Sequence, residues 1–79
     1  SNTMSNPALK GDEIASNPNG YMAMATRAAE LEREGRYIPA LDLWVMAKKA
    51  AKNVINQHWA QARVDLCMTC IHRFGKREA

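Results

Sequence analysis

Apolar residues recur at helical spacing along most of the chain, with charged residues between them. The first such segment begins at Tyr21, and its apolar positions are Tyr21, Met24, Ala25, Ala28 and Leu31. Gly35 follows where a helix commonly ends, because glycine tolerates the left-handed backbone of a C-terminal cap. The pattern therefore predicts a first helix that runs from Tyr21 to the turn at Gly35.

Two further segments repeat this spacing. Pro39 suits the first turn of a helix, where its missing amide donor costs nothing, so we expect a second helix from Pro39 to about Lys52. Asn53 is a favourable N-cap for a third helix ending near Gly75. One face of this helix is expected to carry Ile55, Trp59, Ala62, Leu66 and Cys70, widened by Val54, His58, Cys67, Ile71 and Phe74.

No segment of strand length alternates apolar and polar residues, so the predicted fold class is all-α. Short connections predict that the first two helices form an antiparallel hairpin, with the third packed across it. The hairpin spacing is like that of a single tetratricopeptide repeat, with Leu31, Gly35, Tyr37, Ala40, Trp44 and Ala47 at the matching positions. The apolar stripes are wider than three helices can bury among themselves, so we expect a homodimer.

The chain divides into a flexible arm (residues 1–19), a helical domain (residues 20–75) and a basic tail (residues 76–79). The arm holds two of the three prolines and few apolar residues, too few to offset the entropy of ordering it. Residues 1–3 precede a methionine and look like an expression scar. The Asn-Pro-Asn-Gly segment at residues 17–20 should close the arm as a turn or helix cap.

The length and composition of the chain limit the classes of protein to which it can belong. A chain of 79 residues with 47% apolar content and a net charge of +3 supports one domain. Its longest apolar run is too short for a membrane helix, and no signal peptide is apparent, so we expect a cytoplasmic protein with no membrane partner. Cys67 and Cys70 are too few for a secreted disulfide scaffold.

The residues that could act in catalysis or bind a metal do not form a recognisable site. Cys67, Cys70 and His72 have short spacing, but they lie inside a predicted helix, and His58 is more than two turns away. We therefore expect buried cysteines rather than a metal site. Neither histidine accompanies a nucleophile and an orienting carboxylate, and the sequence has no glycine-rich phosphate loop. The expectation is no enzyme activity, no cofactor and no metal.

The charged residues allow two interpretations, a solvent-exposed surface or a binding surface. Basic side chains gather at Lys48, Lys49 and Lys52 and again at Arg73, Lys76 and Arg77. These are expected as solvated helix ends, and the alternative is contact with nucleic acid through Lys48, Lys49, Lys52 and Arg73. A mixed-charge run of Glu30, Glu32, Arg33, Glu34 and Arg36 should face solvent or, alternatively, orient a protein partner.

Three stretches of the chain carry a family resemblance. They are residues 28–37 (Ala-Ala-Glu-Leu-Glu-Arg-Glu-Gly-Arg-Tyr), residues 40–47 with Trp44 at their centre, and residues 56–63 (Asn-Gln-His-Trp-Ala-Gln-Ala-Arg). Together they resemble the ANR family, small bacterial negative regulators of AraC-type transcription activators. The likeness covers residues 21–71, and its most specific part is the series Asn56, Trp59, Ala62, Arg63 and Cys67. The Leu-Glu-x-x-Gly-x-Tyr hairpin is also similar to that of the PerC-like activators.

The resemblance implies a cytoplasmic regulator that binds an AraC-type activator and suppresses its dimerisation or DNA binding, often in virulence control. The residues themselves indicate a helical protein-interaction module. We expect Gln57, Gln61 and Arg63 to act as polar contacts beside a groove lined by Trp59 and Leu66, because aromatic and arginine side chains dominate such interfaces. The alternatives are a direct DNA-binding regulator and a self-associating helical scaffold.

Overall fold

The computed structural model describes residues 17–74, which form three helices and, within that range, no strand. The helices are α2 (Tyr21–Arg33), α3 (Tyr37–Ala50) and α4 (Val54–Phe74). The all-α fold class is therefore confirmed. The expected arm, apart from its last three residues, and the expected basic tail lie outside the described residues. Within residues 17–74, no helix has the length and apolar character needed to cross a membrane.

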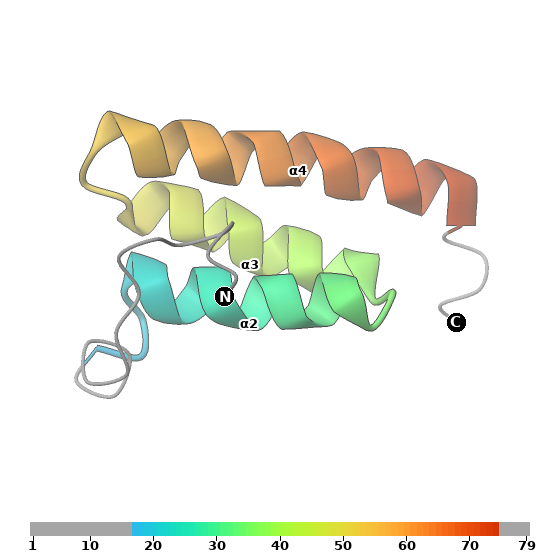
Figure 1. The fold of residues 1–79 in the computed structure, drawn as a ribbon, viewed down its shortest axis with the longest axis horizontal. Helices are drawn as coiled ribbons and strands as arrows, with labels where there is room; N and C mark the ends of the chain where they lie inside the picture. Colours follow the sequence, from blue (N-terminus) through green and yellow to red (C-terminus); the bar gives the residue numbers. More distant parts are fainter. Residues whose placement is uncertain (1–16, 75–79) are drawn as a thin grey trace.

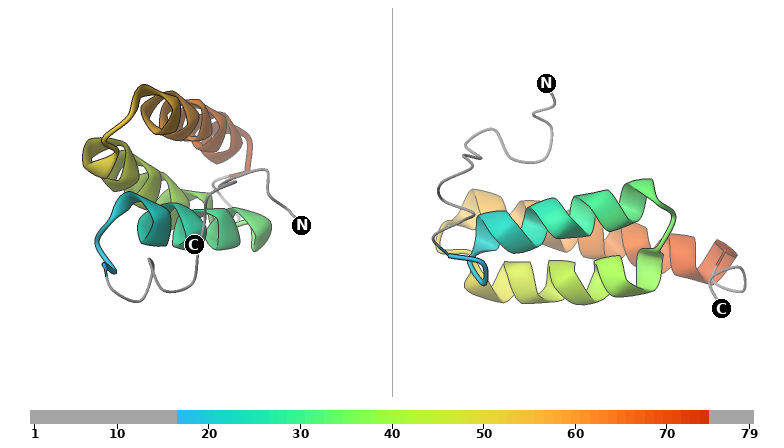
Figure 2. Two further views of the ribbon diagram at one scale, coloured as in Figure 1. Left: turned by 60° about the vertical axis from the view of Figure 1, so that its left-hand side comes forward. Right: turned by 90° about the horizontal axis from the view of Figure 1, so that it is seen from below.

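The three helices lie side by side, with α3 in the middle (Figure 1). Helices α2 and α3 form the expected antiparallel hairpin, and α4 turns back along α3, so α2 and α4 point the same way. Helix α4 packs against α3 as extensively as α2 does, but it touches α2 at few points (Figure 2). With 21 residues against 14 in α3, α4 continues past the end of the hairpin (Figure 1).

The turn between α2 and α3 depends on Gly35. Its φ of +77° lies in the left-handed region, and the Arg36 amide donates to the Leu31 carbonyl oxygen at 2.9 Å. Helix α3 then begins at Tyr37, two residues earlier than expected, because Pro39 is still tolerated within the first turn. It ends at Ala50 rather than Lys52, since Ala51 takes an extended conformation that starts the turn toward α4.

Both expected turns at the helix starts are confirmed. The Gly20 amide donates to the Asn17 carbonyl oxygen at 2.9 Å, which closes a turn, and Gly20 is the N-cap residue of α2. The side-chain oxygen of Asn53 accepts the Asn56 amide at 2.8 Å, which is the geometry of an N-cap. The two helix starts lie at the same end of the molecule (Figure 1).

The core is built from alanines around one large aromatic side chain. Trp44 is 1% exposed and lies among small residues of all three helices. Small side chains let the helix backbones approach closely, so a short chain still excludes water from its centre. The buried cluster consists of Tyr21, Met24, Ala25, Ala28, Ala40, Trp44, Ala47, Ala51, Ala60, Val64 and Cys67.

Helix α4 is rotated relative to the face expected from its sequence. The row that packs on the hairpin is Ala60, Val64 and Cys67. Ile55 and Leu66 of the expected row point away instead, since they are 76% and 40% exposed, whereas Trp59 of the same row is partly buried against the core. Both rows have helical spacing, and the row with small side chains is the one that fits against the alanines of α3.

Candidate interaction surface

A glutamate joins the three helices from inside. The carboxylate of Glu32, near the end of α2, accepts hydrogen bonds from Trp44 Nε1 on α3 at 2.5 Å and from Arg63 on α4. Arg63 binds it with both Nε, at 3.2 Å, and Nη2. The side chains of Glu32 and Arg63 are 9% and 28% exposed, respectively. Such a bidentate, sheltered pair holds α4 in register with α2 although the helices share few contacts.

Arg63 also contacts an aromatic ring on its own helix. Its guanidinium carbon lies 5.4 Å from the centre of the Trp59 ring, a cation–π distance. Hydrogen bonds to Glu32 raise the pKa of the Arg63 guanidinium above its usual value and outweigh the opposing effect of burial. The indole Nε1 of Trp59 is buried and has no hydrogen-bond partner among the described residues.

The expectation that the whole mixed-charge run faces solvent is wrong at Glu32. Its neighbours Glu30, Arg33, Glu34 and Arg36 are exposed, but Glu32 turns inward. An arginine and an indole donor from other helices supply the hydrogen bonds that make its burial possible. No local pattern marks this position, because both partners come from distant parts of the chain.

Cys67 touches the same carboxylate. Its Sγ lies 3.7 Å from Glu32 Oε2 and is fully buried, whereas Cys70 is half-buried. Burial, assisted by repulsion from Glu32, raises the pKa of the Cys67 thiol from 9.0 to about 12. The thiol therefore stays protonated at neutral pH and acts as a packing residue, as expected from its place inside a helix. Residues 17–74 contain no group of three or more His, Cys, Asp or Glu side chains that could hold a metal ion.

A groove runs between α3 and α4 on their outer side. It has a volume of about 540 Å³ and is lined by Val45, Lys48, Lys49, Gln57, Gln61 and Val64. Val45 is 38% exposed, while Val64 is buried and forms part of the floor. Met68 lies one turn beyond Val64 on the same side of α4 and is 56% exposed. The groove therefore joins apolar side chains from two helices with a polar rim.

The polar rim is ordered by hydrogen bonds. Lys48 Nζ donates to Gln61 Oε1 at 2.6 Å, and Gln61 Nε2 donates to Asp65 Oδ1 at 2.9 Å. Gln57 Nε2 donates to the Ala51 carbonyl oxygen at 3.2 Å, which anchors it to the turn before α4. These bonds place amide and ammonium groups along both edges of the groove.

The five predicted partner contacts do not share one surface. Gln57 and Gln61 line the α3–α4 groove. Arg63 lies on the flank of α4 that reaches Glu32 of α2, and Trp59 lies beside it. Leu66 belongs to the outward row of α4. Helical spacing alone could place these residues on one helix, but the packing of α4 puts the two glutamines at the groove and leaves the other three residues outside it.

The predicted nucleic-acid contacts are also divided. Lys48, Lys49 and Lys52 are exposed at the C-terminal end of α3, where they complement the helix dipole. Arg73 is exposed in the last turn of α4, which runs the opposite way from α3. Lys48 donates to Gln61, which precedes Arg73 by 12 positions, so at 1.5 Å per residue Arg73 lies roughly 18 Å or more along α4 from the lysines. The four side chains do not form one continuous basic patch.

Val45 and Val64 were not among the predicted contacts, and Val64 was not part of the apolar face predicted for the third helix. The sequence carries no signal that they meet across a groove, because that depends on the packing of α4 on α3.

Comparisons of the chain with protein-family models, with curated proteins and with solved structures found no match.

Proposed function

We propose that this protein is a transcriptional regulator that acts by binding an AraC-type transcription activator and suppressing its dimerisation or DNA binding. The observation that carries the protein-binding part is the α3–α4 groove, which combines an apolar floor with an ordered polar rim. The AraC-type partner follows from the resemblance of residues 21–71 to the ANR family. The protein is a cytoplasmic binding module without enzymatic activity in this proposal.

The groove has the composition of a site for a helical or extended segment of another protein. Val45, Val64 and Met68 offer an apolar track for one or two anchoring side chains. Lys48 and Lys49 stand on one edge and would pair with carboxylates of the partner. Gln57 and Gln61 supply amide donors and acceptors on the other edge, the role expected for them from the sequence.

A binding experiment with matched variants tests the groove. Wild type, Val45→Asp and Leu66→Asp would be titrated against purified AraC-type activators, with complex formation followed by a pull-down and by calorimetry. Val45 and Leu66 are 38% and 40% exposed, so each substitution disturbs the fold to a similar extent, but only Val45 lines the groove. We expect Val45→Asp to weaken binding about tenfold or more and Leu66→Asp to leave it unchanged.

Arg63→Glu is a poor probe of the interface, because it places a second carboxylate against Glu32 and disturbs the fold itself. Binding that is lost in Leu66→Asp but kept in Val45→Asp would contradict the groove and favour the outward row of α4. No binding of any AraC-type activator by the wild type would contradict the proposed partner.

Direct DNA binding is the second candidate, and the exposed trio Lys48, Lys49 and Lys52 favours it. Titration of duplex DNA at two salt concentrations separates the two functions, because phosphate contacts weaken steeply as salt rises. Specific, salt-sensitive binding by the isolated protein, reduced by Lys49→Gln, would support this candidate. Under the proposed function, the protein alone shows no specific DNA binding.

A further inference from the structure

The register of α3 against α4 shows that the apolar part of their groove continues toward the hairpin turn. The two helices run antiparallel (Figure 1), and Lys48 of α3 donates to Gln61 of α4 at 2.6 Å. One turn nearer the hairpin, the same register places Val45 opposite Val64, and both line the groove. The next apolar side chains then also face one another, in the pairs Leu41 with Met68 and Ile38 with Ile71.

These pairs leave apolar surface open on the outer side of the molecule. Ile38 is 47% exposed, and Val45 and Met68 are exposed as well. Eleven positions separate Ile38 from Lys49, which lines the other end of the groove, so at 1.5 Å per residue the open surface is about 17 Å long. This length corresponds to roughly three turns of a helix.

The polar groups beside the groove favour a helical ligand over an extended one. An extended segment needs partners for its backbone amides and carbonyl oxygens, whereas a helix satisfies its own. Gln61 already accepts from Lys48 and donates to Asp65. Gln57 donates to the Ala51 carbonyl oxygen. The backbone groups of α3 and α4 bond within their own helices, so few groups remain for an extended backbone.

Charge is distributed unevenly along the groove. Lys48 and Lys49 stand where α3 approaches its end, and within residues 17–74 neither forms an ion pair. Asp42 on α3 and Asp65 on α4 are exposed and lie nearer the hairpin turn. A segment that complements both regions carries its negative charge at one end rather than along its whole length.

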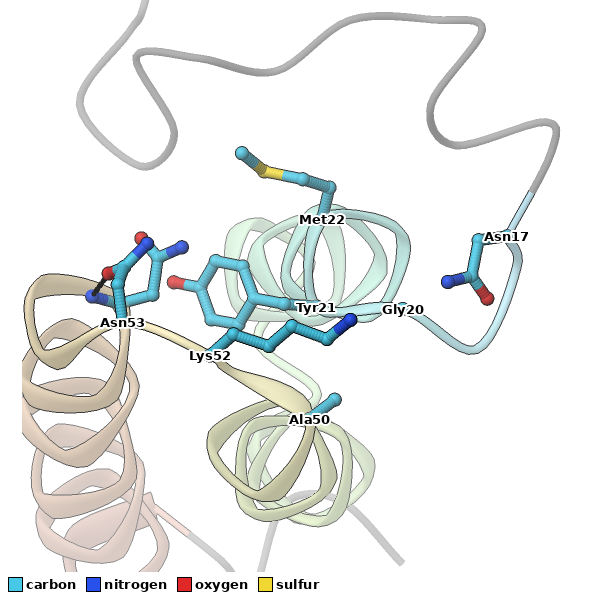
Figure 3. A pocket seen from close by; sticks show the side chains of 8 residues that line it. Asn17, Gly20, Tyr21, Met22, Ala50, Lys52 and Asn53 are labelled. Carbon is cyan, nitrogen blue, oxygen red and sulfur yellow. Dashed lines mark hydrogen bonds between the residues drawn. The ribbon is translucent and has the colours of Figure 1, made fainter.

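Lys52 is close to these lysines in the sequence, but it does not line the groove. Figure 3 shows its side chain extending along Tyr21 toward the side of Gly20, in the pocket beside the start of α2. Lys52 is exposed, as Lys48 and Lys49 are. It therefore offers a matched lysine outside the groove.

We propose that the α3–α4 groove binds an amphipathic helix of the partner protein, with apolar residues at i, i+4 and i+7 and an acidic first turn. The apolar residues pack between the facing side chains of α3 and α4, and the acidic turn pairs with Lys48 and Lys49. Because acidic residues also stabilise the first turn of a helix, the bound helix runs parallel to α4. This inference rests on the proposed function, which uses the same groove, and adds the chemistry of the segment that the groove selects.

The test uses a fluorescent synthetic peptide of about 16 residues, a length at which an alanine-rich helix begins to form in water. The peptide has leucines at i, i+4 and i+7, glutamates in its first turn, and alanine and glutamine elsewhere. Fluorescence anisotropy follows its binding to the full chain. We expect saturable binding, with a gain of helical signal in circular dichroism.

Control peptides separate the parts of the proposal. Replacing the glutamates with glutamines should weaken binding several-fold and reduce its dependence on salt. Moving the leucines to i, i+2 and i+5 keeps the composition but spreads them around the helix, and it should weaken binding about tenfold or more. A central proline, which prevents a continuous helix, should have the same effect.

Matched variants of the protein locate the site. Met68→Asp should weaken peptide binding about tenfold or more, whereas Leu66→Asp, at an exposed position of α4 outside the groove, should bind like wild type. Lys49→Gln should weaken binding about threefold at low salt, and Lys52→Gln should leave it unchanged.

Several results would overturn the inference. They are no binding of the peptide by wild type, equal binding of the proline peptide, and equal losses in Met68→Asp and Leu66→Asp. Displacement of the peptide by self-association of the protein would assign the groove to a second copy, and displacement by duplex DNA would assign it to nucleic acid. Binding of an AraC-type activator without binding of the peptide would overturn this inference alone. Binding of the peptide without binding of any activator would contradict the proposed partner alone.

Discussion

At the scale of single residues, Glu32 connects the three helices through its side chain. Its carboxylate takes hydrogen bonds from α3 and α4 and touches the thiol of Cys67. A carboxylate that is 9% exposed is stable only while these donors remain in place. Glu32 and Arg63 look like surface residues in the sequence, but in the structure their side chains connect α2 with α4.

The first prediction is that Glu32→Ala lowers the free energy of unfolding by about 3 kcal/mol, because it leaves the Arg63 guanidinium and the Trp44 indole without their acceptor. Urea denaturation followed by circular dichroism measures this loss. Glu34→Ala is the control, since Glu34 is 59% exposed in its side chain and should change stability by less than about 0.5 kcal/mol. Equal losses in the two variants would contradict the role of Glu32.

The second prediction concerns alkaline pH. The pKa of the Cys67 thiol is about 12 in the folded protein, against 9.0 for an unperturbed thiol, so the unfolded chain loses this proton first. Stability is therefore fully present below pH 9 and falls as pH rises toward 12. Between pH 8 and pH 10 the expected loss is about 1.4 kcal/mol.

Urea unfolding at the two pH values measures the slope. Cys67→Ala should be less stable at pH 8, because it leaves a small cavity, but it should lack this part of the alkaline loss. An unchanged pH dependence in Cys67→Ala would show that the thiol is not its source.

At the scale of elements, the turns and caps show how local chemistry sets the ends of helices. Gly35 ends α2 with a φ of +77°, and the Asn53 side chain starts α4. Each acts on backbone groups within a few residues of itself, so these positions could be predicted from the sequence. The ends of α3 were less predictable, since Pro39 is allowed at more than one position of a first turn.

The third prediction is that Gly35→Ala destabilises the protein by about 1 kcal/mol, because an L-residue at this φ is strained. No atom of the described residues lies within 4 Å of the place where a Cβ would be added, so strain of the backbone is the only direct cause. Gly35→Asn should cost less, since asparagine tolerates the left-handed region better. Thermal melting compares the two, and an equal or larger loss in Gly35→Asn would contradict this account.

The fourth prediction is that Asn53→Ala costs about 1 kcal/mol, because the Asn56 amide loses its acceptor at the start of α4. Asn53→Asp keeps a cap oxygen and should retain most of the stability. Chemical denaturation measures both. If Asn53→Asp were as unstable as Asn53→Ala, the hydrogen bond to Asn56 would not be the stabilising interaction.

At the scale of the whole molecule, several large apolar side chains remain exposed on the surface of the three helices. Ile55 and Leu66 lie on the outward row of α4, and Val45 and Met68 lie at the α3–α4 groove. The sequence predicts such an excess, because its apolar stripes are too wide for three helices. Two distinct surfaces result. The proposed function assigns the groove to the activator, and the homodimer expected from the sequence would use the outward row.

The fifth prediction follows from this assignment. Light scattering over a range of concentrations should show a dimer of the wild type and a monomer of the double variant Ile55→Lys with Leu66→Lys. The unfolding temperature of the monomeric form should change little, since the side chains at both positions are already exposed. Val45→Lys is the control that should still form a dimer, and its dissociation alone would place the dimer contact at the groove instead.

The sequence by itself determined the three helices, their caps and the hairpin, because each depends on interactions between residues close together in the chain. The tertiary structure alone decided the rotation of α4, the burial of Glu32 and the meeting of Val45 with Val64 across a groove. Arg63 and Glu32 are separated by 31 positions, and no local propensity selects such a pair. It forms because only one row of α4 is small enough to pack against the alanines of α3, and that packing brings the arginine to the carboxylate.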